Sequence, residues 1–95
     1  MKTPAFPVAG SIDARLLYLA AVDKVCPRDL DLHRRKDGFV ARLHQLRAAG
    51  WPLVNIRGDQ WQLYRDRMYP SVRALEGTDG TDWLAQCADY ARGAA

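Results

Sequence analysis

Hydrophobic residues first recur at helical spacing between residues 11 and 25. The repeating positions, three or four residues apart, are Ile12, Leu16, Leu19 and Val22. This spacing places them on one face of an α-helix, and Ser11 before them is a residue type that caps helices. The pattern predicts a helix from Ser11 to about Val25, which Pro27 then interrupts. Residues 1–10 contain two prolines and a glycine and predict an irregular arm.

A second helical pattern covers residues 37–49. Its expected core stripe consists of Phe39, Leu43 and Leu46, with Val40 beside them. Asp37 is the expected N-cap of this helix, and Gly50 is its expected C-terminal stop. The charge-dense residues 28–36 come before it and predict one or two helical turns.

The hydrophobic period then changes. Residues 53–56 and 61–64 are short apolar runs typical of β-strands, and residues 57–60 between them place Gly58 in a turn. This arrangement predicts a β-hairpin. The three tryptophans, Trp51, Trp61 and Trp83, follow apolar patterns, which favours packing in the core or at the hairpin base over the stacking of nucleic-acid bases.

The C-terminal third returns to helical spacing. Residues 70–75 predict a short helix closed by Gly77, and residues 78–81 predict a loop. Thr81 is the expected N-cap of a last helix. Its expected inward residues are Trp83, Leu84, Cys87 and Tyr90 or Ala91.

The predicted order is helix, short helix, longer helix and hairpin, which is the winged helix-turn-helix arrangement. We therefore expect a mainly α fold with a small β-hairpin, in the α+β class. After the arm of residues 1–10, the winged helix-turn-helix domain is expected to span residues 11–67. Residues 68–95 are expected to form a C-terminal helical extension packed on the same domain, since 95 residues suit one domain.

Charge is distributed unevenly along this chain. Residues 1–75 carry 13 basic and 7 acidic side chains, a net charge of +6, whereas residues 76–95 carry one basic and four acidic, a net of −3. A basic body with an acidic tail fits a nucleic-acid partner, and a solubilising surface is the alternative interpretation.

The sequence also indicates where in the cell the protein is expected. No apolar run approaches the ~20 residues of a membrane span, and the N-terminus lacks the pattern of a secretory signal. We therefore expect a cytoplasmic protein without a membrane partner. Cys26 and Cys87 have no metal-ligand spacing, which favours two buried thiols in a reducing cytosol and leaves a disulfide open.

Residues 38–65 carry a series of short motifs. They are Ala41-Arg42-Leu43, Leu46-Arg47, Gly50-Trp51-Pro52-Leu53 and Leu63-Tyr64-Arg65. This series resembles the recognition helix and wing of small winged helix-turn-helix proteins of bacteriophages and prophages. The resemblance implies a DNA-binding protein of a bacterial cell or phage-infected host. Its expected role is that of a transcriptional regulator or an excisionase-like architectural factor.

Double-stranded DNA is the expected partner, and a basic triplet is the first candidate contact. Arg34, Arg35 and Lys36 come just before the longer helix, where they are expected to meet phosphates. A solvated charge run is the alternative interpretation of the triplet.

Four further side chains complete the expected DNA site. Arg42 and Gln45 are the candidates for base edges, because arginine pairs with guanine and glutamine with adenine. Arg57 lies at the expected hairpin tip, a common place for a minor-groove or backbone contact. Arg65 follows the hairpin.

The helical wheel of the longer helix leaves a small outward face, made of Asp37, Gly38, Ala41, Gln45 and Ala48. Either the helix backbone approaches DNA closely, or a protein partner uses this flat surface. Arg47 falls nearer the core stripe, which favours a packing or hydrogen-bonding role for it.

Enzymatic function is not expected. The chain has no glycine-rich phosphate loop, GxSxG or HExxH motif, so we expect no catalytic residues, metal ligands or cofactor. Asp29, Asp31 and His33 superficially suggest a metal site, but acidic residues that balance neighbouring arginines are the favoured interpretation.

The sequence leaves the kind of partner and the oligomeric state open. The alternative to DNA binding is a winged-helix protein of phage type that binds and inhibits a host protein. A homodimer is expected if one small domain must read DNA specifically. The last helix is the candidate dimer contact, and packing within one chain is an equal alternative for it.

Overall fold

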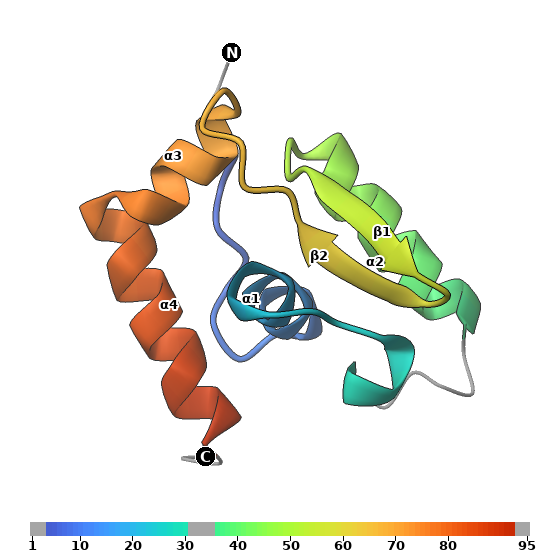
Figure 1. Ribbon diagram of the computed structural model, residues 1–95. Helices are drawn as coiled ribbons and strands as arrows, with labels where there is room; N and C mark the ends of the chain where they lie inside the picture. The colour runs from blue at the N-terminus through green and yellow to red at the C-terminus, as the bar shows by residue number, and fades with distance from the viewer. Residues whose placement is uncertain (1–3, 31–35, 93–95) are drawn as a thin grey trace.

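The computed structural model describes residues 4–30 and 36–92 (Figure 1). In chain order, these residues form α1 (Ile12–Val22), the 3₁₀-helix η1 (Pro27–Leu30), α2 (Lys36–Ala48), β1 (Leu53–Arg57), β2 (Gln60–Leu63), α3 (Pro70–Glu76) and α4 (Thr78–Ala91). The described parts of the chain therefore make a small α+β fold with four α-helices and one antiparallel hairpin, in agreement with the predicted class.

Helix α1 begins as predicted and ends earlier. The Ser11 side chain accepts a 3.2 Å hydrogen bond from the Ala14 backbone N–H and caps the helix. The helix stops at Val22 rather than near Val25, because Val25 forms an antiparallel bridge with Trp61. Both backbone hydrogen bonds of this bridge measure 2.8 Å, and they attach the hairpin to the segment that follows α1.

The buried face of α1 also differs from the predicted stripe. Its buried residues are Ala14, Leu16, Leu17 and Ala20. Ile12 and Val22, which were expected to face inward, are exposed by 41% and 47%. The buried positions share one broad face of the helix, which packs against β2, α4 and α2, and Ile12 and Val22 lie outside this face.

Helix α2 confirms the predicted core stripe and corrects its start. Phe39, Leu43 and Leu46 are buried, whereas Val40 is exposed. The helix begins at Lys36, so Asp37 lies within its first turn and is not the N-cap. Gly50 follows the last turn with a φ of 111°, a left-handed conformation that favours glycine, and confirms the predicted stop.

The hairpin is confirmed with strand ends shifted by one residue. Leu53 pairs with Leu63 on the inner face, and both side chains are buried. The register shifts between Asn55 and Arg57. The Asn55 side chain donates hydrogen bonds of 2.9 and 3.1 Å to the carbonyls of Gly58 and Gln60, which stabilises the turn.

Helices α3 and α4 follow each other with Gly77 alone between them. The predicted loop of residues 78–81 is wrong, because these residues form the first turn of α4. Thr81 therefore lies inside the helix rather than at its N-cap, and its hydroxyl donates to the Gly77 carbonyl. A Cβ at Gly80 would lie 2.5 Å from Cα of Leu75, so only glycine allows these helices to approach so closely.

The inward face of α4 is shorter than predicted. Trp83 and Cys87 are buried and Leu84 is half-buried, as expected. Tyr90 and Ala91 are exposed instead. The Tyr90 ring lies over the backbone of Gly10, where a Cβ would come within 2.9 Å of it, and so contacts the arm rather than the core.

The arm is irregular, as predicted, and it also packs into the core. The Phe6 ring lies between Trp51 and Trp83, with centroid distances of 5.6 and 5.4 Å. These two tryptophans are buried and Trp61 is half-buried, so the predicted packing role of the three is confirmed. One core cluster joins residues of α1, α2, both strands, α3 and α4.

Candidate nucleic-acid interface

Helix α2 and the hairpin lie together on one side of α1, and α4 lies on the other (Figure 1). The corner between α2 and β1 is held by the Trp51 backbone N–H, which donates a 3.0 Å hydrogen bond to the carbonyl of Leu46. The Trp51 side chain is 1% exposed. Burial of this residue fixes the position of the hairpin relative to the end of α2.

The outward face of α2 is exposed. Ala41, Gln45 and Ala48 all face solvent, as the helical wheel predicts, and His44 is exposed beside them. Gln45 forms no side-chain hydrogen bond within the described residues, so its amide is available to a partner. The two alanines make this part of the exposed face small and apolar.

Arg57 is the last residue of β1 and comes directly before the two turn residues, Gly58 and Asp59. Its side chain is exposed, and it forms no ion pair with another residue in the described ranges. Asp59 is also exposed. The tip of the hairpin therefore presents one cation and one anion close together in sequence.

Arg42 is committed to a contact within the protein. Its Nη1 atom donates a 2.9 Å hydrogen bond to Oδ1 of Asp13, and both side chains are about one third exposed. This ion pair joins α2 to α1. The Nη1 atom of Arg42 is therefore engaged with Asp13, whereas the side chain of Gln45 makes no hydrogen bond within the described residues.

Arg65 is also engaged. Its Nη2 atom donates a 2.7 Å hydrogen bond to the carbonyl of Ala21. The side chain of Gln62 donates similarly, at 3.0 Å, to the carbonyl of Asp23. Both carbonyls belong to the end of α1, where helix carbonyls lack partners within the helix. Arg65 and Gln62 thus fasten the hairpin to the C-terminal end of α1.

The remaining predicted contacts are those of the basic triplet. Arg34 and Arg35 lie outside the described residues, and Lys36 is the first residue of α2. The structure therefore brings Gln45 and Arg57 to the exposed surfaces of α2 and the hairpin, and it places Arg42 and Arg65 at contacts with α1.

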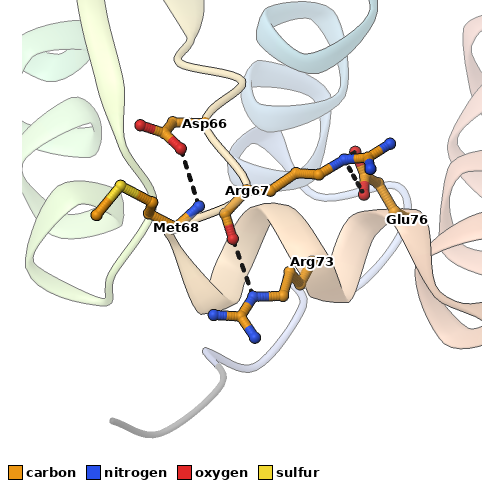
Figure 2. Close-up of polar contacts among 5 residues, drawn as sticks. All are labelled: Asp66, Arg67, Met68, Arg73 and Glu76. Atoms are coloured by element: carbon orange, nitrogen blue, oxygen red, sulfur yellow. Dashed lines mark hydrogen bonds and ion pairs between the residues drawn. The ribbon is translucent and has the colours of Figure 1, made fainter.

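At the connection between β2 and α3 lie Arg67 and Arg73, whose contacts within the protein the sequence patterns do not predict (Figure 2). Nε of Arg73 donates a 2.9 Å hydrogen bond to the carbonyl of Arg67, whose own guanidinium pairs with Glu76 at 3.2 Å. The backbone N–H of Met68 donates to Oδ1 of Asp66. No spacing rule predicts these contacts, because they depend on how the chain turns into α3.

The acidic tail lies away from α2 and the hairpin. Its exposed side chains are Glu76, Asp79, Asp82 and Asp89, at the end of α3 and along α4. Helix α1 separates α4 from the hairpin (Figure 1). The acidic side chains of α4 are thus separated from the hairpin in space, whereas Glu76 pairs with Arg67 of the basic part of the sequence.

Both cysteines are free thiols, so the structure has no disulfide between them. Cys87 is buried, and this burial raises the pKa of its thiol from 9.0 to about 11. Cys26 is only half-buried, which corrects the expectation of two buried thiols. It follows α1 and precedes Pro27, the first residue of η1.

The described residues contain no group of three or more His, Cys, Asp or Glu side chains placed to hold a metal ion. Asp29 instead accepts a 3.0 Å hydrogen bond from the backbone N–H of Cys26, and Asp31 and His33 lie outside the described residues. Among the helices in the described ranges, none has the length and apolar character to cross a membrane.

No family model matches this chain, and no curated protein or solved structure matches it.

Proposed function

We propose that residues 11–67 form a winged helix-turn-helix domain that binds double-stranded DNA, with α2 as the recognition helix and the β1–β2 hairpin as the wing. The observation that carries this proposal is the exposed face of α2, formed by Ala41, Gln45 and Ala48, beside a hairpin that presents Arg57 near its tip. A helix with small outward side chains suits close approach to the floor of a major groove.

The attachment of the hairpin supports this assignment. The Val25–Trp61 bridge and the hydrogen bond from Arg65 to Ala21 connect β2 and its flank to α1. The Arg42–Asp13 ion pair connects α2 to the same helix. Helix and wing are therefore held by one scaffold, which fixes their spacing before any DNA arrives and lowers the entropic cost of binding.

The side chains divide into two roles under this proposal. Gln45 contacts a base edge, and Arg57 contacts the phosphate backbone or minor groove beside it. The triplet of Arg34, Arg35 and Lys36, which ends at the first residue of α2, supplies phosphate contacts. Arg42 and Arg65 position α2 and the hairpin through α1.

The biological role proposed is that of a small transcriptional regulator or an excisionase-like architectural factor of a phage or prophage. It acts in the cytoplasm of a bacterial or phage-infected cell and is not an enzyme. Because one domain of this size reads only a short half-site, we further propose a dimer or a cooperative array on DNA. The position of the acidic α4 away from the hairpin leaves the DNA face free of tail charges.

Fluorescence anisotropy with a labelled duplex tests the division of roles. We expect Arg57→Gln to weaken binding about threefold to tenfold and to reduce the salt dependence by about one phosphate contact. Arg92→Gln is the control for net charge, since it removes one exposed positive charge at the far end of α4, where Arg92 pairs with Asp89. Equal losses from both variants would show a response to net charge alone and would contradict the proposed wing contact.

A protein partner is the second candidate, and the outer face of the hairpin favours it. Val54 and Ile56 are 37% and 45% exposed, and Tyr64 just beyond β2 is 49% exposed. Three apolar side chains on one small surface are typical of a contact with another protein. Under this candidate, the chain inhibits a host protein, Val54→Thr with Ile56→Thr abolishes that contact, and Arg57→Gln leaves it unchanged.

A further inference from the structure

The segment that follows α1 lies beside the hairpin as a third row. Val25 pairs with Trp61 along one edge of β2, and Trp61 pairs with Asn55 of β1 along the other edge. These three residues therefore lie side by side across β1, β2 and the segment. Both backbone hydrogen bonds between Val25 and Trp61 measure 2.8 Å, so the position of this segment relative to the hairpin is fixed.

The direction of this pairing decides which end of the hairpin η1 approaches. The segment runs antiparallel to β2 at Val25, so the residues after Val25 lie beside the residues before Trp61. Gln60 comes directly before Trp61 and pairs with Arg57 next to the turn. Since η1 begins at Pro27, it starts beside the turn of the hairpin. The turn, η1 and the start of α2 lie at the same end of the molecule (Figure 1).

The short helix η1 presents one arginine to solvent on an anchored base. Its first and last residues, Pro27 and Leu30, are buried, whereas Arg28 and Asp29 between them are exposed. The carboxylate of Asp29 accepts a 3.0 Å hydrogen bond from the backbone N–H of Cys26. This bond and the two buried residues hold η1 in place, so the backbone of Arg28 keeps a fixed position next to the hairpin turn.

Arg28 and Arg57 therefore belong to one end of the molecule, on opposite sides of β2. Within the described ranges, neither arginine belongs to an ion pair. Neighbouring strands lie about 4.8 Å apart, so the segment that carries η1 and β1 are separated by about 10 Å. A guanidinium binds phosphate through paired hydrogen bonds. Two arginines at this separation can bind two different phosphates of one duplex.

We propose that Arg28 binds a DNA phosphate beside the wing, so that the DNA-binding surface extends from α2 and the hairpin turn onto η1. This inference rests on the proposed DNA binding and adds a contact that no sequence motif assigns. Arg28 pairs with one phosphate, and Arg57 contacts the duplex from the other side of β2. Each arginine contributes separately to the affinity and to its salt dependence.

Affinity measurements with matched arginine variants test this contact. Arg28→Gln should weaken the binding of a labelled duplex about threefold to tenfold and lower the salt slope by about one. The double variant with Arg57→Gln should lose the product of the two single losses, because the contacts are separate. Arg15→Gln is the control, since Arg15 is an exposed arginine of α1 that lines a hollow with Cys87 and Tyr90 of α4. Equal losses from Arg28→Gln and Arg15→Gln would overturn the proposal.

Chemical modification of the unmutated protein separates this inference from the proposed function. Phenylglyoxal modifies accessible guanidinium groups, and mass spectrometry of peptides measures the extent at each arginine. We expect a saturating duplex at low salt to protect Arg28 and Arg57 and to leave Arg15 reactive. Protection of Arg57 together with full modification of Arg28 would overturn the contact from η1 and keep the wing contact. Full modification of both Arg28 and Arg57 would overturn the inference and the proposed wing contact together.

Discussion

The indole Nε1 of Trp83 donates a 2.7 Å hydrogen bond to the carbonyl of Pro7, and so joins two residues 76 positions apart. Phe6, next to Pro7, lies between the rings of Trp83 and Trp51. The arm thereby connects α4 to the corner between α2 and β1. The arm has no helical or strand pattern in its sequence, and yet it completes the core by contacting two distant parts of the chain.

The first prediction concerns this arm. Phe6→Ala should lower the free energy of unfolding by about 2 kcal/mol, because it removes an aromatic ring that is half-buried between two tryptophans. Val8→Ala in the same arm is the control, since Val8 is 80% exposed, and it should change the stability by less than about 0.5 kcal/mol. Urea unfolding followed by tryptophan fluorescence measures both. Equal effects of the two alanines would show that the arm is not anchored by Phe6.

The second prediction concerns the pair of Arg42 and Asp13. A double-mutant cycle with Arg42→Gln and Asp13→Asn should give a coupling free energy below about 1 kcal/mol, because both side chains are about one third exposed. In DNA titrations, Arg42→Gln should weaken binding less than Arg57→Gln does. If Arg42→Gln instead weakens DNA binding more than Arg57→Gln does, Arg42 has the base-edge role that the sequence predicts.

The third prediction uses a variant that should improve binding. Asp59 is exposed in the turn next to Arg57, so its negative charge opposes the approach of phosphates. Asp59→Asn should tighten DNA binding about twofold to fivefold at low salt, and the gain should shrink as salt screens the charge. Partial unfolding cannot produce such a gain. Asp82→Asn on α4 is the matched control, and a similar gain there would place the DNA elsewhere.

The fourth prediction concerns the thiols. Burial raises the pKa of Cys87 to about 11, so at pH 8 its thiolate is about a hundredfold scarcer than that of an ordinary cysteine. A disulfide reagent such as Ellman's should therefore modify Cys26 in the folded protein and reach Cys87 only after unfolding. Cys87→Ser identifies the fast thiol. A fast reaction at both thiols would contradict the burial of Cys87.

The raised pKa of Cys87 also has a consequence for stability. The folded state prefers the neutral thiol, so its contribution is complete below the unfolded pKa of 9.0 and is lost as the pH rises through about 11. Denaturant unfolding between pH 8 and pH 11 should show a decline in stability that is smaller in Cys87→Ala. An identical decline in both proteins would assign it to other groups.

Sequence patterns predicted α2 and the hairpin well, for a physical reason. Phe39, Leu43 and Leu46 meet one surface, so their spacing reflects the helix period directly. The inner pair Leu53 and Leu63 reflects the strand period in the same way. In a helix or strand with one buried face, the spacing of the apolar residues is enough to predict which residues are buried.

The errors arose where burial or a side-chain contact depends on elements that are distant in the sequence. The buried face of α1 is set by its packing against β2, α4 and α2, and so Ile12 and Val22, which the spacing predicts inside, are exposed. The start of α4 depends on the close contact between Gly80 and Leu75, which no local pattern reveals. Arg42 and Arg65 contact residues that are 29 and 44 positions away in the sequence, and local sequence patterns do not predict contacts over such separations.

The most direct test of the central claim is the binding of the unmodified protein to a random-sequence duplex, measured by fluorescence anisotropy at several salt concentrations. DNA binding through α2 and the wing predicts clear binding at low salt, a steep linear fall of log affinity with log salt, and its loss when Arg34, Arg35 and Lys36 are all changed to Glu. Folded protein that binds no duplex at the lowest salt would contradict the claim and would favour a protein partner.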